Sequence, residues 1–203
     1  MDIRTAQLTD QAHIVDLIYS AGPELYDFLY QTSAHRAQDF IAYEFASGQG
    51  FCGYPNVTVA VRDGVVVGTG CFFDGKNYDR LSLQTLRNMI AFYGWRELVP
   101  VLLHTAHIGS VMKRPKKDEL YLSNFGVAPA CRSQGIGRAM IEQQIARAKQ
   151  QGYRLFALDV AATNPRAQKL YESLGLHVIC QKAFSGKRAG HNVPDARKME
   201  RIL

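Results

Sequence analysis

One stretch of the sequence decides the fold: ELYLSNFGVAPACRSQGIGR, residues 119–138. Its first half, Leu120–Val127, is short and apolar, as in a buried strand, and Pro129 ends it because proline has no amide for a sheet ladder. A glycine-rich turn follows. From Ile136 onward, apolar side chains recur at helical spacing as far as Gly152, which is typical of a helix C-cap. The stretch therefore predicts a strand, a glycine turn and a helix.

A turn of this kind predicts an anion site. Glycine lets the backbone approach a phosphate closely, free amides of the first helical turn point at it, and the helix dipole adds roughly 0.3–1 kcal/mol per charge. A dinucleotide-binding turn would carry a third glycine near Met140. A nucleotide P-loop would continue as Gly-Lys-Ser/Thr, whereas Gly137 is followed by Arg138. The sequence therefore excludes both a dinucleotide-binding turn and a nucleotide P-loop.

Residues 132–137, Arg-Ser-Gln-Gly-Ile-Gly, resemble the Arg/Gln-x-x-Gly-x-Gly pyrophosphate loop of the GNAT superfamily of acetyl-CoA-dependent N-acetyltransferases. A second stretch, NPRAQKLYESLG at residues 164–175, is similar to the second signature of that family. It lies at the expected distance and follows the expected strand. Because two ordered motifs match, the resemblance is specific over about residues 118–180 and holds in outline elsewhere.

Size and composition fit a single soluble domain. At 203 residues the chain can bury about 70% of its unfolded surface, so neither a disulfide nor a metal is required for stability. The cysteines lie far apart and form no Cys-x-x-Cys pair, which favours a reduced, cytoplasmic protein. The first residues do not read as a signal peptide, and no apolar run approaches the length of a membrane helix. We therefore expect no membrane partner.

The net charge of +6 fits attraction to the phosphates of coenzyme A, and would equally attract nucleic acid. Basic residues are scattered, however, apart from short runs at 113–117 and 182–188. Such runs are typical of solvated loops, so we expect no nucleic-acid partner.

The rest of the chain alternates strands and helices, which favours an α/β fold. The resemblance makes it a GNAT fold, with a central mixed, twisted sheet of about six or seven strands flanked by helices. Strands are expected over residues 3–7, 154–160, 176–181 and 197–202, and a hairpin over 57–71 around Asp63-Gly64. Helices are expected after Asp10, after Ser33 and from Pro165 to Gly175.

About 45 residues separate the hairpin from the strand at 118, where a minimal acetyltransferase needs only a few. We expect one domain, 1–203, with a helical insertion at about 74–117 and an acetyl-CoA-binding core at about 118–180. The insertion should hold one or two helices, broken near Gly94, with one apolar stripe formed by Leu86, Met89, Ile90 and Tyr93 and another by Leu98, Val101 and Leu102. It would cover the substrate side or form a homodimer interface. His104 and His107 lack a partner at metal spacing, so no metal is expected.

The resemblance implies which residues hold the cosubstrate. The backbone at a strand bulge, Phe125, Gly126 and Val127, would bind the pantetheine arm, and a nearby amide would stabilise the thioester oxygen by about 2.7–4 kcal/mol. Asn164 would be a further contact. The pyrophosphate would lie on the turn formed by Arg132, Ser133, Gln134, Gly135, Ile136, Gly137 and Arg138.

Tyr171 lies seven residues, or two helical turns, after Asn164, so the two share a helix face. The resemblance makes Tyr171 a cosubstrate contact and the acid that protonates the departing thiolate. The alternative is an ordinary core tyrosine. Because a thiol with a pKa near 8.5 leaves as a tolerable anion, the acid should contribute about 10²–10⁴-fold to the rate.

The acceptor amine needs the opposite help, since an amine with a pKa of about 10.4 is neutral in only about 1 molecule in 2,500 at pH 7. Asp159 stands where the resembled ribosomal-protein acetyltransferases carry an acidic residue, although Asp is shorter than Glu. A purely structural strand-end role is the alternative. Tyr121 and Ser123 could instead hold a water. Tyr26 and Phe28 follow the first helix, where the family forms one wall of the acceptor groove, or they serve only in packing.

The sequence thus predicts an acyltransferase that moves acetyl from acetyl-CoA directly to a primary amine. The long insertion favours a compact, small-molecule amine, which is the acceptor we expect. The run around Asp159 favours a protein N-terminus or lysine. A non-catalytic acyl-CoA sensor and a nucleic-acid-binding domain are the rivals from other classes.

Overall fold

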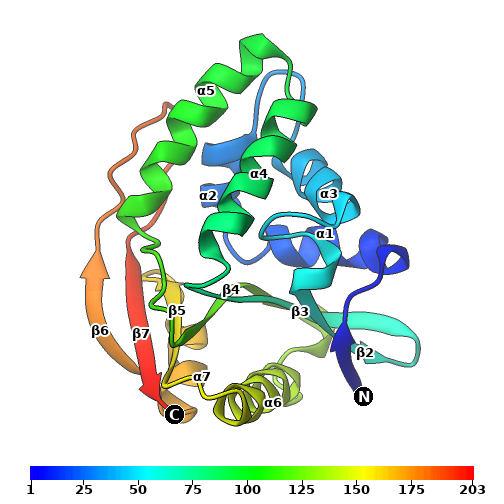
Figure 1. Ribbon diagram of the computed structural model, residues 1–203, viewed down its shortest axis with the longest axis vertical. Coiled ribbons are helices and arrows are strands. Elements are labelled where there is room, and N and C mark those ends of the chain that lie inside the picture. Colours follow the sequence, from blue (N-terminus) through cyan, green and yellow to red (C-terminus); the bar gives the residue numbers. More distant parts are fainter.

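A mixed sheet of seven strands runs through the molecule in the order β1-β2-β3-β4-β5-β7-β6 (Figure 1). In this computed structural model, which describes residues 1–203, only β4 and β5 are parallel neighbours. The mixed α/β sheet predicted from the sequence is confirmed. Its strands are β1 Asp2–Thr5, β2 Val57–Arg62, β3 Val65–Asp74, β4 Glu119–Val127, β5 Leu155–Ala161, β6 His177–Lys182 and β7 Ala196–Ile202.

Helices cover both faces of the sheet (Figure 1). One face carries α1 Gln11–Tyr19, α2 Pro23–Tyr30, α3 Ala37–Ser47, α4 Tyr78–Phe92 and α5 Trp95–Thr105. The other carries α6 Ile136–Gln150 and α7 Pro165–Ser173. None of them is both long enough and apolar enough to cross a lipid bilayer. We call the face that carries the first five helices the α1–α5 face and the other the α6–α7 face. Each of the two faces has its own apolar core.

The hairpin of β2 and β3 forms as its turn sequence predicts. Arg62 pairs with Val65, and the two residues between them, Asp63 and Gly64, have φ of 53° and 77°. Positive φ at both positions is what the favoured two-residue hairpin turn requires, and Asp-Gly supplies it at low cost.

The insertion between β3 and β4 contains α4, α5 and a short helical turn at Ala106–Ser110. The predicted break near Gly94 is confirmed. Of the predicted stripe, Met89 and Tyr93 are buried, whereas Leu86 and Ile90 are 37% and 55% exposed. The helix is rotated so that Thr85 and Asn88 face inward and bond to residues of α3 and the loop after it.

The two ends of the insertion are closed against each other. The Gly75 amide donates to the Lys116 carbonyl at 3.2 Å. A Cβ on Gly75 would lie 2.3 Å from the Pro115 carbonyl oxygen, so only glycine fits there. The insertion therefore leaves and rejoins the sheet at one point.

Gly75→Ala should lower the free energy of unfolding by about 1–3 kcal/mol, because the new Cβ meets backbone that cannot move aside. Gly109→Ala is the control: nothing lies within 4 Å of that Cβ, and its effect should stay within about 0.5 kcal/mol. Denaturant unfolding measures both variants, and equal stabilities would disprove the tight closure.

Candidate active site

The central feature of the sheet is a separation between β4 and β5. They pair from Glu119 with Leu155 up to Leu122 with Leu158, and no further. Beyond that point β4 stays with β3 as far as Val127, while β5 stays with β7. The edge of β4 that faces the gap therefore has no strand partner, in the middle of a sheet. Its backbone groups are left to pair with side chains or a ligand, as the Val127 carbonyl does with Arg132 Nε at 3.0 Å.

A bulge in β4 lies at this gap. Between the pairs Ser123–Cys71 and Gly126–Thr69, β4 advances three residues while β3 advances two. Asn124 lies within the bulge, with a φ of 53°. Past it, the Ala128 amide donates to β3. Because backbone groups alternate along a strand, the N–H and C=O of Val127 then point away from β3 and toward the gap.

The turn between β4 and α6 presents a run of free amides. Ser133 and Gly135 have φ of 63° and 79°, and Gly135 directly precedes the helix. None of the amides of residues 133–138 donates to another group of the chain. They lie at the positive end of the α6 dipole, which is the arrangement that binds phosphate groups.

Arginines from four different segments surround this turn, and each is held by a hydrogen bond. They come from β2, the turn itself, α6 and α7, so their charges add to the attraction of the free amides for an anion. The sequence motifs identified two of them. The others, Arg62 and Arg166, lie outside the pyrophosphate motif and were missed. The bonds are Arg62 to Gln134 Oε1 (2.5 Å), Arg132 to Val127 O (3.0 Å), Arg138 to Ser173 Oγ (2.8 Å) and Arg166 to Ser133 Oγ (2.9 Å).

Gly137 lets the bulge and the second motif meet. A Cβ there would lie 3.3 Å from the Phe125 ring and 3.4 Å from the Leu170 side chain. Asn164 is exposed and caps α7, its side chain accepting the Ala167 amide at 3.0 Å. The turn, the bulge of β4 and α7 thus form one continuous site.

Tyr171 is buried in the apolar core of the α6–α7 face, together with Leu122 and Leu158, the last residues that β4 and β5 share. Burial raises the pKa of Tyr171, and no hydrogen-bond partner contributes to that shift. Its hydroxyl therefore keeps its proton at neutral pH and has that proton free to donate.

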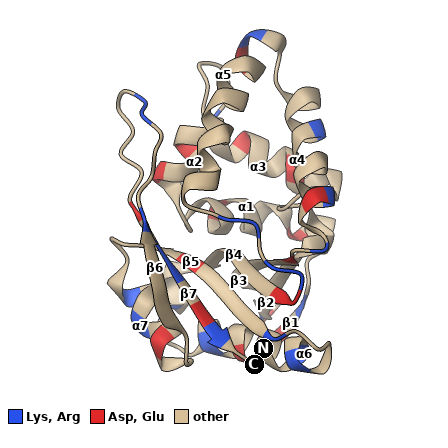
Figure 2. Cartoon of the chain, turned by 60° about the vertical axis from the view of Figure 1, so that its left-hand side comes forward, with Lys and Arg blue, Asp and Glu red and all other residues tan.

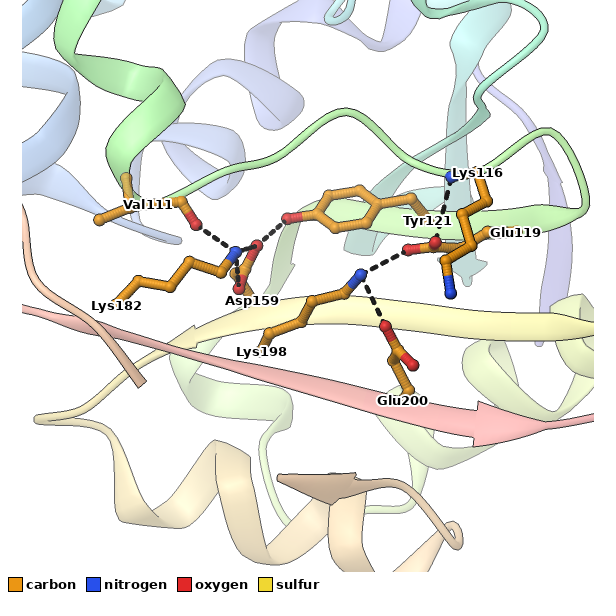
Figure 3. Close-up of polar contacts among 8 residues, drawn as sticks. All are labelled: Val111, Lys116, Glu119, Tyr121, Asp159, Lys182, Lys198 and Glu200. Carbon is orange, nitrogen blue, oxygen red and sulfur yellow. Dashed lines mark hydrogen bonds and ion pairs between the residues drawn. The ribbon is translucent and has the colours of Figure 1, made fainter. Parts of the chain in front are cut away.

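Asp159 points to the opposite, α1–α5 face, since its neighbours Leu158 and Val160 lie in the α6–α7 core. Its two carboxylate oxygens lie 2.8 and 2.9 Å from Lys182 Nζ, and the Tyr121 hydroxyl donates to it at 2.7 Å (Figure 3). Burial, then the nearby carboxylate, raises the pKa of Tyr121 well above its usual value.

The sequence did not predict Lys182 as a site residue, because it begins a basic run that is typical of a solvated loop. In the structure Lys182 lies on β6. It also donates to the Val111 carbonyl at 2.7 Å, so it links the insertion to the sheet (Figure 3). A second ion-pair group lies beside it. Burial alone would lower the pKa of Lys198, but Glu200 at 2.6 Å and Glu119 at 3.1 Å hold it above its usual value.

The other residues singled out from the sequence lie in different environments. Tyr26 and Phe28 are 7% and 1% exposed and belong to the large core of the α1–α5 face, which favours the packing alternative. Ser123 is half-buried where the strands separate. His104 packs against Phe28, and no three His, Cys, Asp or Glu side chains gather where they could hold a metal ion.

Lys182→Met should lower the free energy of unfolding by about 3–5 kcal/mol, because it leaves the carboxylate of Asp159, whose side chain is only 11% exposed, without its counter-ion. Adding Asp159→Asn to the same chain should recover most of that loss. Denaturant unfolding of the two variants decides the matter: an equal loss in both would show that the pair is not coupled.

Comparison with known proteins agrees with this geometry. A model of the Acetyltransferase (GNAT) family matches residues 17–176. The [ribosomal protein bS18]-alanine N-acetyltransferase of Escherichia coli K12 is 42% identical over 60 residues, or 30% of this chain and 40% of that protein. The chain thus spans well under half the length of the curated relatives that it matches.

Solved structures share the fold. A crystal structure described as an acetyltransferase superposes with a TM-score of 0.68 at 19% identity, covering 100% of this chain and 99% of that one. A putative acetyltransferase from Salmonella typhimurium, solved with its cofactor acetyl-CoA, superposes with a TM-score of 0.55 at 20% identity, covering 100% and 94%. The family model covers most of the sequence, and the chain therefore belongs to the acetyltransferase (GNAT) family.

Proposed function

We propose that the protein is an acetyl-CoA-dependent N-acetyltransferase that transfers acetyl directly to the primary amine of a small molecule. The observation that carries this proposal is the gap between β4 and β5, which ends at a turn of free amides ringed by arginines. The Salmonella relative solved with acetyl-CoA supports the same cosubstrate.

The residues present fit acetyl-CoA. The amides of residues 133–138 have no acceptor in the chain and suit a pyrophosphate, and a Cβ at Gly135 would meet nothing within 4 Å, so the turn is open. Arg132 and Arg138 add charge. The backbone of Phe125 and Val127 would bind the pantetheine arm, and Gly126 lies between them on the bulged strand.

The two faces of the sheet suit two proton-transfer roles. Tyr171, on the α6–α7 face, would give its proton to the sulfur as the carbon–sulfur bond breaks. The amine would attack the thioester carbon from the α1–α5 face and lose a proton there. We propose that Asp159 draws that proton away, because its carboxylate faces this side, or that a water held by Tyr121 and Ser123 does so instead.

A compact acceptor fits the covered α1–α5 face. The loop between β6 and β7 rises beside α2 and α5 (Figure 2). Arg188 of this loop donates to the Asp27 and Phe28 carbonyls at 2.9 and 2.8 Å, and the Ser185 amide donates to Ser110 of the insertion at 3.2 Å. The loop and the insertion thus close over the side from which an acceptor would enter.

A protein N-terminus is the second candidate acceptor, because the curated relative at 42% identity is a ribosomal-protein alanine N-acetyltransferase. We further propose that residues 1–203 act as one catalytic domain in the reducing cytoplasm, as a monomer or homodimer. Its cysteines are all free. Basic residues are interleaved with acidic ones (Figure 2), which fits a protein without a nucleic-acid partner.

Incubation with acetyl-CoA and panels of small amines and N-terminal peptides should release coenzyme A with at least one small amine. Loss of thioester absorbance measures this release directly. Calorimetric binding of acetyl-CoA without release against any panel member would instead identify a non-catalytic sensor. Release with peptides alone would move the acceptor to the protein class.

Tyr171→Phe should slow acetyl transfer by about 10²–10⁴-fold, because the departing sulfur loses its proton donor. The affinity for acetyl-CoA, measured by calorimetry, should stay unchanged, since the ring still fills its apolar site. Turnover at the wild-type rate would remove Tyr171 from the mechanism.

A further inference from the structure

The β4 bulge contains a residue in an unfavourable backbone conformation. Asn124 has a φ of 53°, in the left-handed region where a side chain with a Cβ is disfavoured and glycine is the usual choice. Asparagine tolerates this region better than most residues, but something must still hold it there.

The side chain of Asn124 reaches two cysteine sulfurs. Its Nδ2 donates to Cys52 Sγ at 3.3 Å and to Cys71 Sγ at 3.7 Å. Cys71 lies on β3 and pairs with Ser123, the residue before Asn124. Cys52 lies in the loop between α3 and β2, and its own amide donates to Glu44 at 3.3 Å. One side chain therefore joins β4, β3 and this loop.

The surroundings keep these contacts intact. The two cysteines are 4% and 0% exposed, so both sulfur acceptors are shielded from water, while Asn124 itself is half-buried. The adjacent Cys71 sulfur, together with burial, raises the pKa of Cys52 well above its usual value, and the thiol stays neutral. Gly126, two residues on, packs directly under the Leu17 carbonyl of α1, where a Cβ would lie 2.6 Å away.

We propose that Cys52 and Cys71 are positioning residues for acetyl transfer: their sulfurs clamp Asn124 and so hold the bulge that directs the Val127 backbone into the gap between β4 and β5. The inference rests on the proposed function, since the bulge is taken to bind the pantetheine arm. Loosening the clamp should weaken acetyl-CoA binding more than it slows chemistry, because the clamp touches neither Tyr171 nor Asp159.

Paired substitutions test the clamp. Cys52→Ala and Cys71→Ala each remove one of the two sulfur acceptors of the Asn124 amide. Cys52→Ser and Cys71→Ser replace that sulfur with a hydroxyl acceptor at nearly the same place. Each alanine variant should raise the KM for acetyl-CoA about three- to tenfold with a smaller change in kcat, and each serine variant should return toward the wild-type KM. Cys180→Ala, at an exposed position on β6, is the control and should change neither.

Asn124→Asp keeps the shape of the side chain but removes the donor, and should raise KM as the alanine variants do. It serves as the test if an alanine variant fails to fold. Wild-type KM in the alanine variants and Asn124→Asp would overturn the clamp, as would equal impairment of the alanine and serine variants. If the wild type itself shows no turnover, the proposed function fails separately. The clamp is then judged by whether the Asn124 side-chain amide signal in NMR moves in the alanine variants but not in Cys180→Ala.

Discussion

The structure depends on the separation of its two parallel strands. β4 and β5 share hydrogen bonds only as far as Leu122 and Leu158. Backbone groups in the middle of a sheet need partners, and those of β4 beyond this point face a gap instead of a strand. The flanking strands keep the gap open, since β3 holds β4 through its bulge and β7 holds β5 along its full length. The turn before α6 then places unpartnered amides and arginine charge at one end of this gap.

The same sheet separates two chemical environments. On the α6–α7 face, Tyr171 lies in an apolar cluster, and burial there raises the pKa of its phenol. On the α1–α5 face, Asp159 lies between an ammonium and a phenol. The sheet thus holds a buried phenol on one side and an ion-paired carboxylate on the other, and the proposed proton transfers use these two sides. Lys182 also donates to the Val111 carbonyl, so the same ammonium that pairs with Asp159 fixes the end of the insertion over the α1–α5 face.

Local patterns were sufficient for much of the fold. Asp63-Gly64 determines its turn through backbone preference alone, and the strand, glycine turn and helix of residues 119–150 follow from spacing.

The residues that the sequence did not predict are those that only the tertiary structure brings together. Lys182, Arg62, Arg166 and the pair Cys52–Cys71 become neighbours of the site only through the strand order, which brings residues far apart in sequence together. Apolar periodicity also could not show that polar Thr85 and Asn88 are turned inward while Leu86 and Ile90 stay exposed. No helix was predicted around Tyr26 and Phe28, yet Pro23–Tyr30 forms one, and Arg188 from the distant β6–β7 loop caps its end.

The central claim is that the gap and its turn bind the cosubstrate through main-chain amides. Titrating coenzyme A into ¹⁵N-labelled protein tests it most directly, residue by residue. The account predicts that the backbone amide signals of residues 133–138 and of Val127 shift together and saturate at one affinity. Signals there that stay in place while amides elsewhere respond would contradict it.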